Sequence, residues 1–107
     1  DKDGALDYAG KLVYLFSGQS SSQLVIVAQR KLETQLDGLR LDYAKIDGME
    51  PDNKEARKAI WDMTGAKPGT YPIVVNMTSG KSWQGDDLQA AMDNNEFKTA
   101  LAEFVKD

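Results

Sequence analysis

The sequence contains no cysteine and no histidine. Without cysteine it can form no disulfide, no thiolate nucleophile and no cysteine-ligated metal site. Without histidine, Ser-His and Cys-His catalysis, histidine proton shuttling and nearly all zinc sites are excluded. We therefore expect a protein that is not an enzyme and that holds neither a metal ion nor an obligatory cofactor.

Long hydrophobic runs are also missing, because no stretch approaches the roughly 20 apolar residues of a membrane-spanning helix. The first ten residues lack the basic start and apolar stretch of a secretory signal, and the absence of an initiator methionine leads us to expect an excised domain or processed form. Acidic side chains outnumber basic ones, 17 to 13, so the net charge of −4 disfavours nucleic-acid binding. We expect a cytoplasmic protein without a membrane or nucleic-acid partner, since a disulfide-free domain suits that compartment.

What is present is the composition of an ordinary globular domain, with 41% hydrophobic and 28% charged residues in a chain of 107. That length suits one hydrophobic core. The polar stretch 1–10 is interpreted as a flexible lead-in, and residues 11–107 as a single domain without repeats or linkers.

Hydrophobic periodicity and turn residues predict the order β-α-β-α-β-β-α, followed by a final helix. The predicted strands span residues 12–16, 39–46, 73–77 and 81–84. The predicted helices span residues 23–36, 52–64 and 86–93, with a last one that carries Phe97, Leu101, Phe104 and Val105. The opening β-α-β unit implies a parallel strand pair, and the turn at 78–80 implies an antiparallel one. We therefore expect an α/β domain with a four-stranded mixed sheet flanked by helices.

The helix starts are predicted from capping-box spacings. These are Ser20 with Gln23, Asp52 with Glu55, and Asp86 with Gln89. The second helix is expected to bury Ala56, Ala59, Ile60 and Met63. The run Leu24-Val25-Ile26-Val27 would suit a strand equally well by propensity, but the length of the polar-periodic stretch to Leu36 favours a helix.

This order, with Pro72 directly before the third predicted strand, resembles the thioredoxin superfamily in its glutaredoxin-like form. Phe16-Ser17 resembles the strand end that leads to the glutaredoxin cysteines, and residues 70–74 (TYPIV) resemble the Thr-x-Pro signature, whose proline is cis in that family. Residues 36–43 and 73–76, with Gly85-Asp86, are similar to a non-catalytic branch, the Src-homology-3-binding glutamic-acid-rich-like proteins. The resemblance covers about residues 11–105 and implies a thioredoxin-like fold with a cis-proline at Pro72.

The sequence departs from glutaredoxins where their chemistry would lie. Ser21 falls near the nucleophilic position and Leu24 near the resolving one. A serine hydroxyl without a nearby base does not replace a thiolate stabilised by a helix N-terminus, so the resemblance implies a redox-inactive module. Pro68 and Pro72 are four positions apart, whereas a PxxP segment needs three, so binding of Src-homology-3 domains is not expected.

The resemblance also implies a vestigial groove built from three segments. Its expected residues are Ser20, Ser21, Ser22, Tyr71, Pro72, Gly85 and Asp86. Each also has a simpler interpretation, since Ser20 and Asp86 suit helix caps, a cis-proline suits a tight turn, and small residues suit a loop. Trp83, on an expected edge strand, is weighed evenly between a core residue and an interface anchor, whereas Trp61 is expected in the core or at its margin.

Three functions remain open at this point. The leading one is a protein–protein interaction or scaffold module that uses the groove or Trp83, with an unidentified protein partner. The second is weak binding of glutathione or an anionic small molecule, although Gln84-Gly85 replaces the usual glycine pair of glutaredoxins and crowds the groove. The third is a structural or dimerisation domain of a longer chain, present as a monomer or a weak homodimer.

Overall fold

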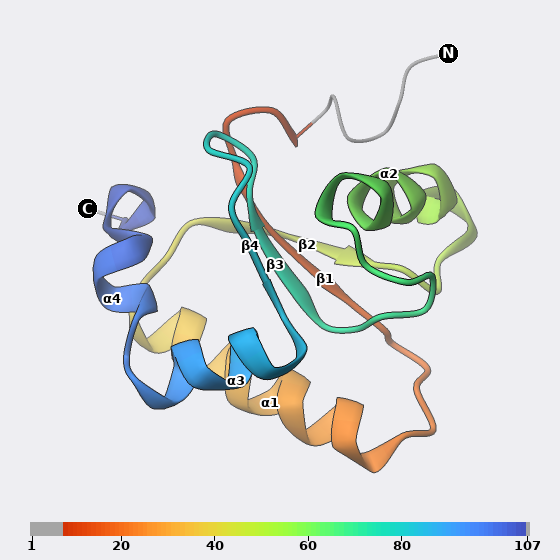
Figure 1. Cartoon of the computed structure of the whole chain (residues 1–107), viewed down its shortest axis with the longest axis horizontal. Helices are drawn as coiled ribbons and strands as arrows, with labels where there is room; N and C mark the ends of the chain where they lie inside the picture. Colours follow the sequence, from red (N-terminus) through yellow and green to blue (C-terminus); the bar gives the residue numbers. More distant parts are fainter. Residues whose placement is uncertain (1–7, 107) are drawn as a thin grey trace.

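Four strands form one mixed sheet in the computed structural model, which describes residues 8–106 (Figure 1). The strands are β1 (Leu12–Phe16), β2 (Tyr43–Asp47), β3 (Ile73–Asn76) and β4 (Ser82–Gln84). Their order across the sheet is β2-β1-β3-β4; β1 and β2 are parallel, whereas β3 is antiparallel to both β1 and β4. The prediction of an α/β domain with a four-stranded mixed sheet is confirmed.

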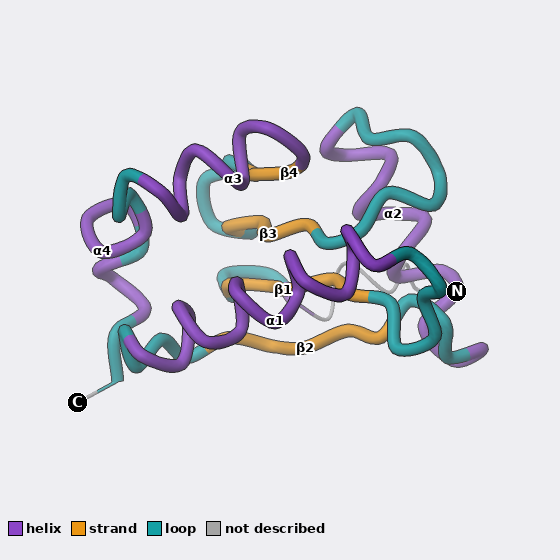
Figure 2. The backbone as a smooth tube through the Cα atoms, turned by 90° about the horizontal axis from the view of Figure 1, so that it is seen from below, coloured by secondary structure: helices purple, strands orange, loops and turns teal. Residues whose placement is uncertain are grey.

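Helices cover both faces of this sheet. They are α1 (Gln23–Gly38), α2 (Lys54–Thr64), α3 (Gly85–Asp93) and α4 (Phe97–Ala100), with short 3-10 turns at Pro51–Asn53 and Ala102–Phe104. Figures 1 and 2 show α1 and α3 side by side on one face, with α4 beyond them, and α2 on the other face. α1 and α3 together form one face of the molecule.

The alternation of side chains along β1 divides the core into two halves. Leu12 and Tyr14 pack with side chains of α1, α3 and α4, whereas Val13 and Leu15 pack with side chains of α2. All four are fully buried, because consecutive strand residues point to opposite faces and both faces are covered. This explains why the run lacks the alternation of polar and apolar residues that marks a half-exposed strand.

The first helix begins at the predicted residue but with a different cap. Ser22 is the N-cap, and its Oγ accepts a hydrogen bond from the Val25 N–H at 3.4 Å. The Oγ of Ser20, the predicted cap, instead accepts from the Ser22 N–H at 3.1 Å, within the loop. The capping-box prediction for Ser20 is therefore wrong, because a cap must directly precede the first helical turn.

The other two predicted caps are wrong for a similar reason. Asp52 lies inside the 3-10 turn that precedes α2, and Asp86 lies in the first turn of α3, which begins one residue earlier at Gly85. Neither helix has a side-chain cap. Both aspartates still lie where the helix dipole favours a negative charge.

The second strand begins later than the alternation of residues 39–46 predicts. Leu39 is the C-cap of α1, and Arg40 adopts a left-handed conformation with φ of 59°. Leu41 forms an isolated antiparallel bridge with Val105, so this part of the chain pairs with the C-terminal segment and not with β1. A contact so distant in sequence leaves no local signal.

Two further predictions about apolar residues need correction. Met63, expected on the inner face of α2, is 45% exposed, whereas Trp61 is buried. The predicted last helix is a single short α4 followed by a 3-10 turn, which leaves Val105 46% exposed. In the expected lead-in, residues 1–7 lie outside the described residues, and Tyr8 packs against the half of the core under α2.

Candidate functional site

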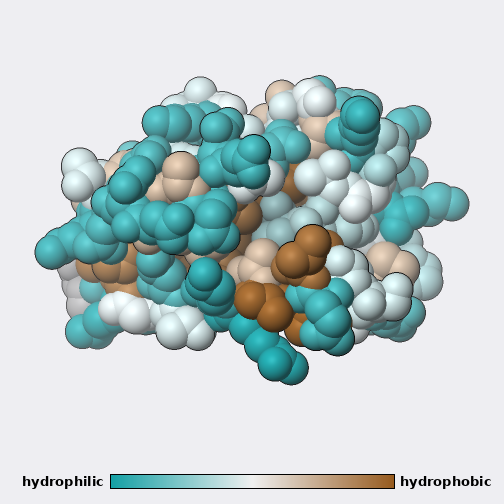
Figure 3. Space-filling view, turned by 60° about the horizontal axis from the view of Figure 1, so that its bottom comes forward, coloured by the Kyte–Doolittle hydropathy of each residue, from teal (hydrophilic) through white to brown (hydrophobic). Residues whose placement is uncertain are grey.

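Three of the predicted site residues, Tyr71, Pro72 and Gly85, line a groove of about 150 Å³ between α1 and α3. We call it the Pro72 groove. Its remaining walls come from the two helices: Leu24, Val25, Ala28, Leu88, Gln89 and Met92. Most of these side chains are apolar, and Figure 3 shows hydrophobic side chains gathered around a hollow on this side of the molecule. The groove therefore suits an apolar group.

Leu24, which lines the groove, is the most exposed large hydrophobic side chain of the described residues. Leu24 is 85% exposed and Val27 is 50% exposed, both in the first turns of α1. A single exposed leucine is ordinary, but one that lines an apolar groove loses water-exposed apolar surface when the groove is covered. Fully burying one leucine contributes about 1.5–3 kcal/mol.

The ring of Tyr71 is held in place by Trp61, which does not line the groove. Trp61 contacts it edge-on, with ring centroids 5.7 Å apart, and the Trp61 indole N–H donates to the Thr70 carbonyl at 3.1 Å. Burial raises the pKa of the Tyr71 phenol above its ordinary value, although the nearby Arg57 guanidinium opposes this shift. The contact with Trp61 fixes the position of this wall of the groove.

The backbone at Tyr71 is unusual in two respects. The Tyr71–Pro72 peptide bond is cis. Within residues 8–106, neither the N–H nor the C=O of Tyr71 forms a hydrogen bond. Main-chain groups left unpaired beside an apolar groove can pair with an extended partner segment.

Replacing Gly48 by alanine tests how Tyr71 is held. An alanine Cβ at this position would overlap the hydroxyl and ring of Tyr71, so the ring must move. We expect the Gly48→Ala change to lower the free energy of unfolding by about 1–3 kcal/mol, the usual cost of overpacking.

The same change should have almost no effect when Tyr71 is already alanine, because the overlapping ring is then absent. Urea unfolding of the wild type, both single variants and the double variant measures this coupling. Additive losses in the double variant would contradict the assigned contact.

Two side chains fix the loop between β1 and α1. The amide of Gln29 pairs with both backbone groups of Ser17, accepting from its N–H at 2.8 Å and donating to its C=O at 3.1 Å. The Oδ1 of Asp47 accepts from the N–H groups of Gly18 and Met49, both at 3.0 Å. The entry to α1, and with it one wall of the groove, is therefore rigidly attached to the sheet.

The remaining predicted groove residues lie outside this cavity. Ser20, Ser21 and Ser22 are not among the residues that line it. The Oγ of Ser20 accepts a hydrogen bond within the loop, and the Oγ of Ser22 caps α1. Asp86 is exposed in the first turn of α3 and also does not line it. Gly85 lines the cavity. Its φ of 55° is a left-handed conformation that favours glycine over any larger residue.

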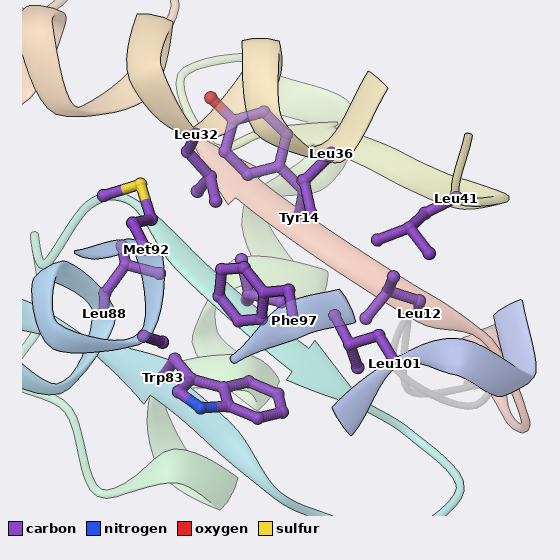
Figure 4. Packing of buried hydrophobic residues seen from close by; sticks show 12 residues of the cluster. Leu12, Tyr14, Leu32, Leu36, Leu41, Trp83, Leu88, Met92, Phe97 and Leu101 are labelled. Atoms are coloured by element: carbon purple, nitrogen blue, oxygen red, sulfur yellow. The ribbon is translucent and has the colours of Figure 1, made fainter. Parts of the chain in front are cut away.

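Trp83 belongs to the core and not to the surface. It is 3% exposed, its ring packs edge-on against Phe97 with centroids 5.2 Å apart, and its indole N–H donates to Glu96 at 2.9 Å (Figure 4). Of the two interpretations weighed for Trp83, this favours the core over the interface anchor.

Sequence reasoning missed the residues of the two helices that form the groove walls. Val25, Ala28, Leu88 and Met92 come together only because α1 and α3 pack side by side. One signal was available, since residues 24–27 form an apolar run too wide for one buried helix stripe. Gln29 and Asp47 were missed because polar residues on a helix or in a loop are usually solvent-exposed.

Among the residues that the structure describes, no helix combines the length and apolarity that crossing a membrane requires, and no cluster of acidic side chains could hold a metal ion.

Comparison with known proteins adds no family to this geometry. The chain matches no protein-family model, and no curated protein proves similar to it.

Proposed function

We propose that this chain is a redox-inactive protein–protein interaction module with a thioredoxin-like, glutaredoxin-like fold. It binds an apolar side chain of a partner protein in the Pro72 groove. The observation that carries this proposal is a preformed apolar groove with exposed Leu24 on its rim and the unpaired backbone of Tyr71 in its wall.

The strand order supports the proposed fold. A β-α-β unit followed by an antiparallel hairpin, arranged as β2-β1-β3-β4, agrees with the fold that the resemblance implies. The position of the Tyr71–Pro72 bond, directly before β3, agrees with the Thr-x-Pro resemblance of residues 70–74. The complete absence of cysteine is the reason for proposing a module without thiol chemistry.

The size of the groove favours a partner side chain over a small molecule. Pockets for small-molecule ligands usually enclose about 300–1,000 Å³, whereas the Pro72 groove encloses about 150 Å³. That volume suits one large aliphatic or aromatic side chain, with the rest of the partner segment lying across the rim. Glutathione binding is therefore the weaker proposal.

A set of blocked seven-residue peptides tests this function. They contain serine and glycine around one central leucine, phenylalanine or alanine, and they are titrated into ¹⁵N-labelled protein followed by NMR. We expect the leucine and phenylalanine peptides at millimolar concentration to shift the amide signals of Val25, Ala28 and Met92, and the alanine peptide to leave them unchanged. Glutathione is titrated in parallel.

Leu24→Ser is the matching variant, because a side chain that is 85% exposed can be replaced without disturbing the core. We expect it to weaken binding of the leucine peptide by about threefold to tenfold, through loss of part of the apolar contact. Met63→Ser, a similar change on α2 across the sheet, is the control and should leave binding unchanged. Equal shifts for all three peptides, or none, would refute the proposal, and shifts with glutathione alone would favour the small-molecule function.

A further inference from the structure

A second and larger cavity lies farther along the same two helices. It encloses about 440 Å³ and is lined by Arg30, Lys31, Thr34, Gln35, Met92 and Asp93. We call it the basic groove. Met92 lines both cavities, so the Pro72 groove and the basic groove adjoin along the α1–α3 face.

The charges of the basic groove are unusual for this protein. Within residues 8–106, neither Arg30 nor Lys31 has a carboxylate oxygen within 4.0 Å. The wall contains one acid, Asp93, and its Oδ1 already accepts a hydrogen bond from the Gln89 amide at 2.9 Å. The wall therefore carries a positive excess, whereas the whole chain has a net charge of −4.

The floor of the basic groove contains an unused hydrogen-bond acceptor. The Gln35 amide nitrogen donates to the Met92 carbonyl at 3.3 Å, but its buried Oε1 has no partner within residues 8–106. Buried polar atoms without partners are uncommon in folded proteins. Because Gln35 lines the basic groove, a rotation of its side chain toward the cavity would present this oxygen to the backbone N–H of a bound segment.

The distance between the two cavities fits a short stretch of extended chain. The residues of α1 that line the Pro72 groove are Leu24, Val25 and Ala28, and those that line the basic groove are Arg30, Lys31, Thr34 and Gln35. A helix rises about 1.5 Å per residue, so their centres lie about 10 Å apart along α1. An extended chain covers that distance in about three residues.

We propose that the α1–α3 face binds a partner segment with an apolar side chain and, about three residues away, an acidic side chain. The apolar side chain occupies the Pro72 groove, and the carboxylate lies between Arg30 and Lys31. The exposed carboxylates of Asp86 and Asp87 near the opposite end of the face disfavour an acidic side chain there. This inference rests on the proposed function and specifies its partner chemistry.

The experiment compares four blocked peptides by NMR titration of the intact chain. Two peptides contain a leucine and an Asp-Glu pair separated by two serines. In one peptide the leucine precedes the acidic pair, and in the other it follows it. A third has Lys-Lys in place of the Asp-Glu pair, and a fourth has Ser-Ser there. We expect one of the acidic peptides to bind at least about threefold more tightly than the serine peptide, because an exposed charge pair changes affinity by a few-fold. The lysine peptide should bind more weakly than the serine peptide.

Arg30→Glu/Lys31→Glu is the test variant, and Lys54→Glu/Lys58→Glu, exposed on α2, is the control with the same change in net charge. The test variant should prefer the lysine peptide, whereas the control should keep the wild-type order. If the leucine peptides bind equally well whatever their charge, this inference fails and the proposed function survives. If no peptide binds, both fail.

Discussion

Replacement of Trp83 by alanine is expected to lower the free energy of unfolding by about 3–5 kcal/mol, a typical cost of removing a buried aromatic side chain. The indole is 3% exposed and packs against Phe97, so its removal leaves a cavity beneath α3 and α4. Small domains have a total stability of about 5–15 kcal/mol, so this loss brings the variant close to unfolding at moderate temperature. Urea unfolding followed by circular dichroism measures it.

Trp83→Phe separates packing from hydrogen bonding in that experiment. It keeps an aromatic ring beside Phe97 but removes the indole N–H that donates to Glu96. A loss of about 1 kcal/mol is expected from that hydrogen bond. If Trp83→Ala left stability within about 0.5 kcal/mol of the wild type, the usual effect of a surface substitution, the core assignment would be wrong.

Replacement of Gln29 by leucine is expected to cost about 2–4 kcal/mol, although leucine suits both a helix and a buried position. The reason is that the N–H and C=O of Ser17 lose their partners while Ser17 is 6% exposed. The amide of Ser17 should also exchange with solvent faster, because the loop between β1 and α1 opens more readily. Unfolding in urea and hydrogen exchange followed by NMR measure the two effects.

Gln23→Leu is the matched control for that change. Gln23 begins the same helix but is exposed, so its replacement should alter stability by less than about 0.5 kcal/mol. Equal effects of the two substitutions would show that the pairing of Gln29 with Ser17 contributes nothing.

The sequence predicts the sheet and its flanking helices because their signals are local. Three examples are the apolar run at 12–16, the tight turn at 78–80 and the helical periodicity of α2. Each of these signals is formed by residues that are close together in the sequence. The start of β2 was not predictable in this way, since it depends on Arg40 in a left-handed conformation and on a bridge between Leu41 and Val105.

The candidate site was predictable only in part for the same reason. Tyr71, Pro72 and Gly85 were found through a resemblance, whereas the other walls of the groove depend on how α1 packs against α3. Arg30 and Lys31 carry no local signal of a site, because adjacent charged residues on a helix usually form a solvated face. Only the folded structure shows that they line a cavity next to the Pro72 groove.

Met92 forms part of the wall in both cavities, and the nature of its side chain affects how selective this face can be. A methionine has three rotatable bonds and a polarisable sulfur, so it adapts its shape to different neighbours. Pro72 on the other side has a fixed ring and cannot adapt. For the proposed partner segment, we therefore expect the α3 side of the face to tolerate residues of different shape, and the start of β3 to discriminate between them.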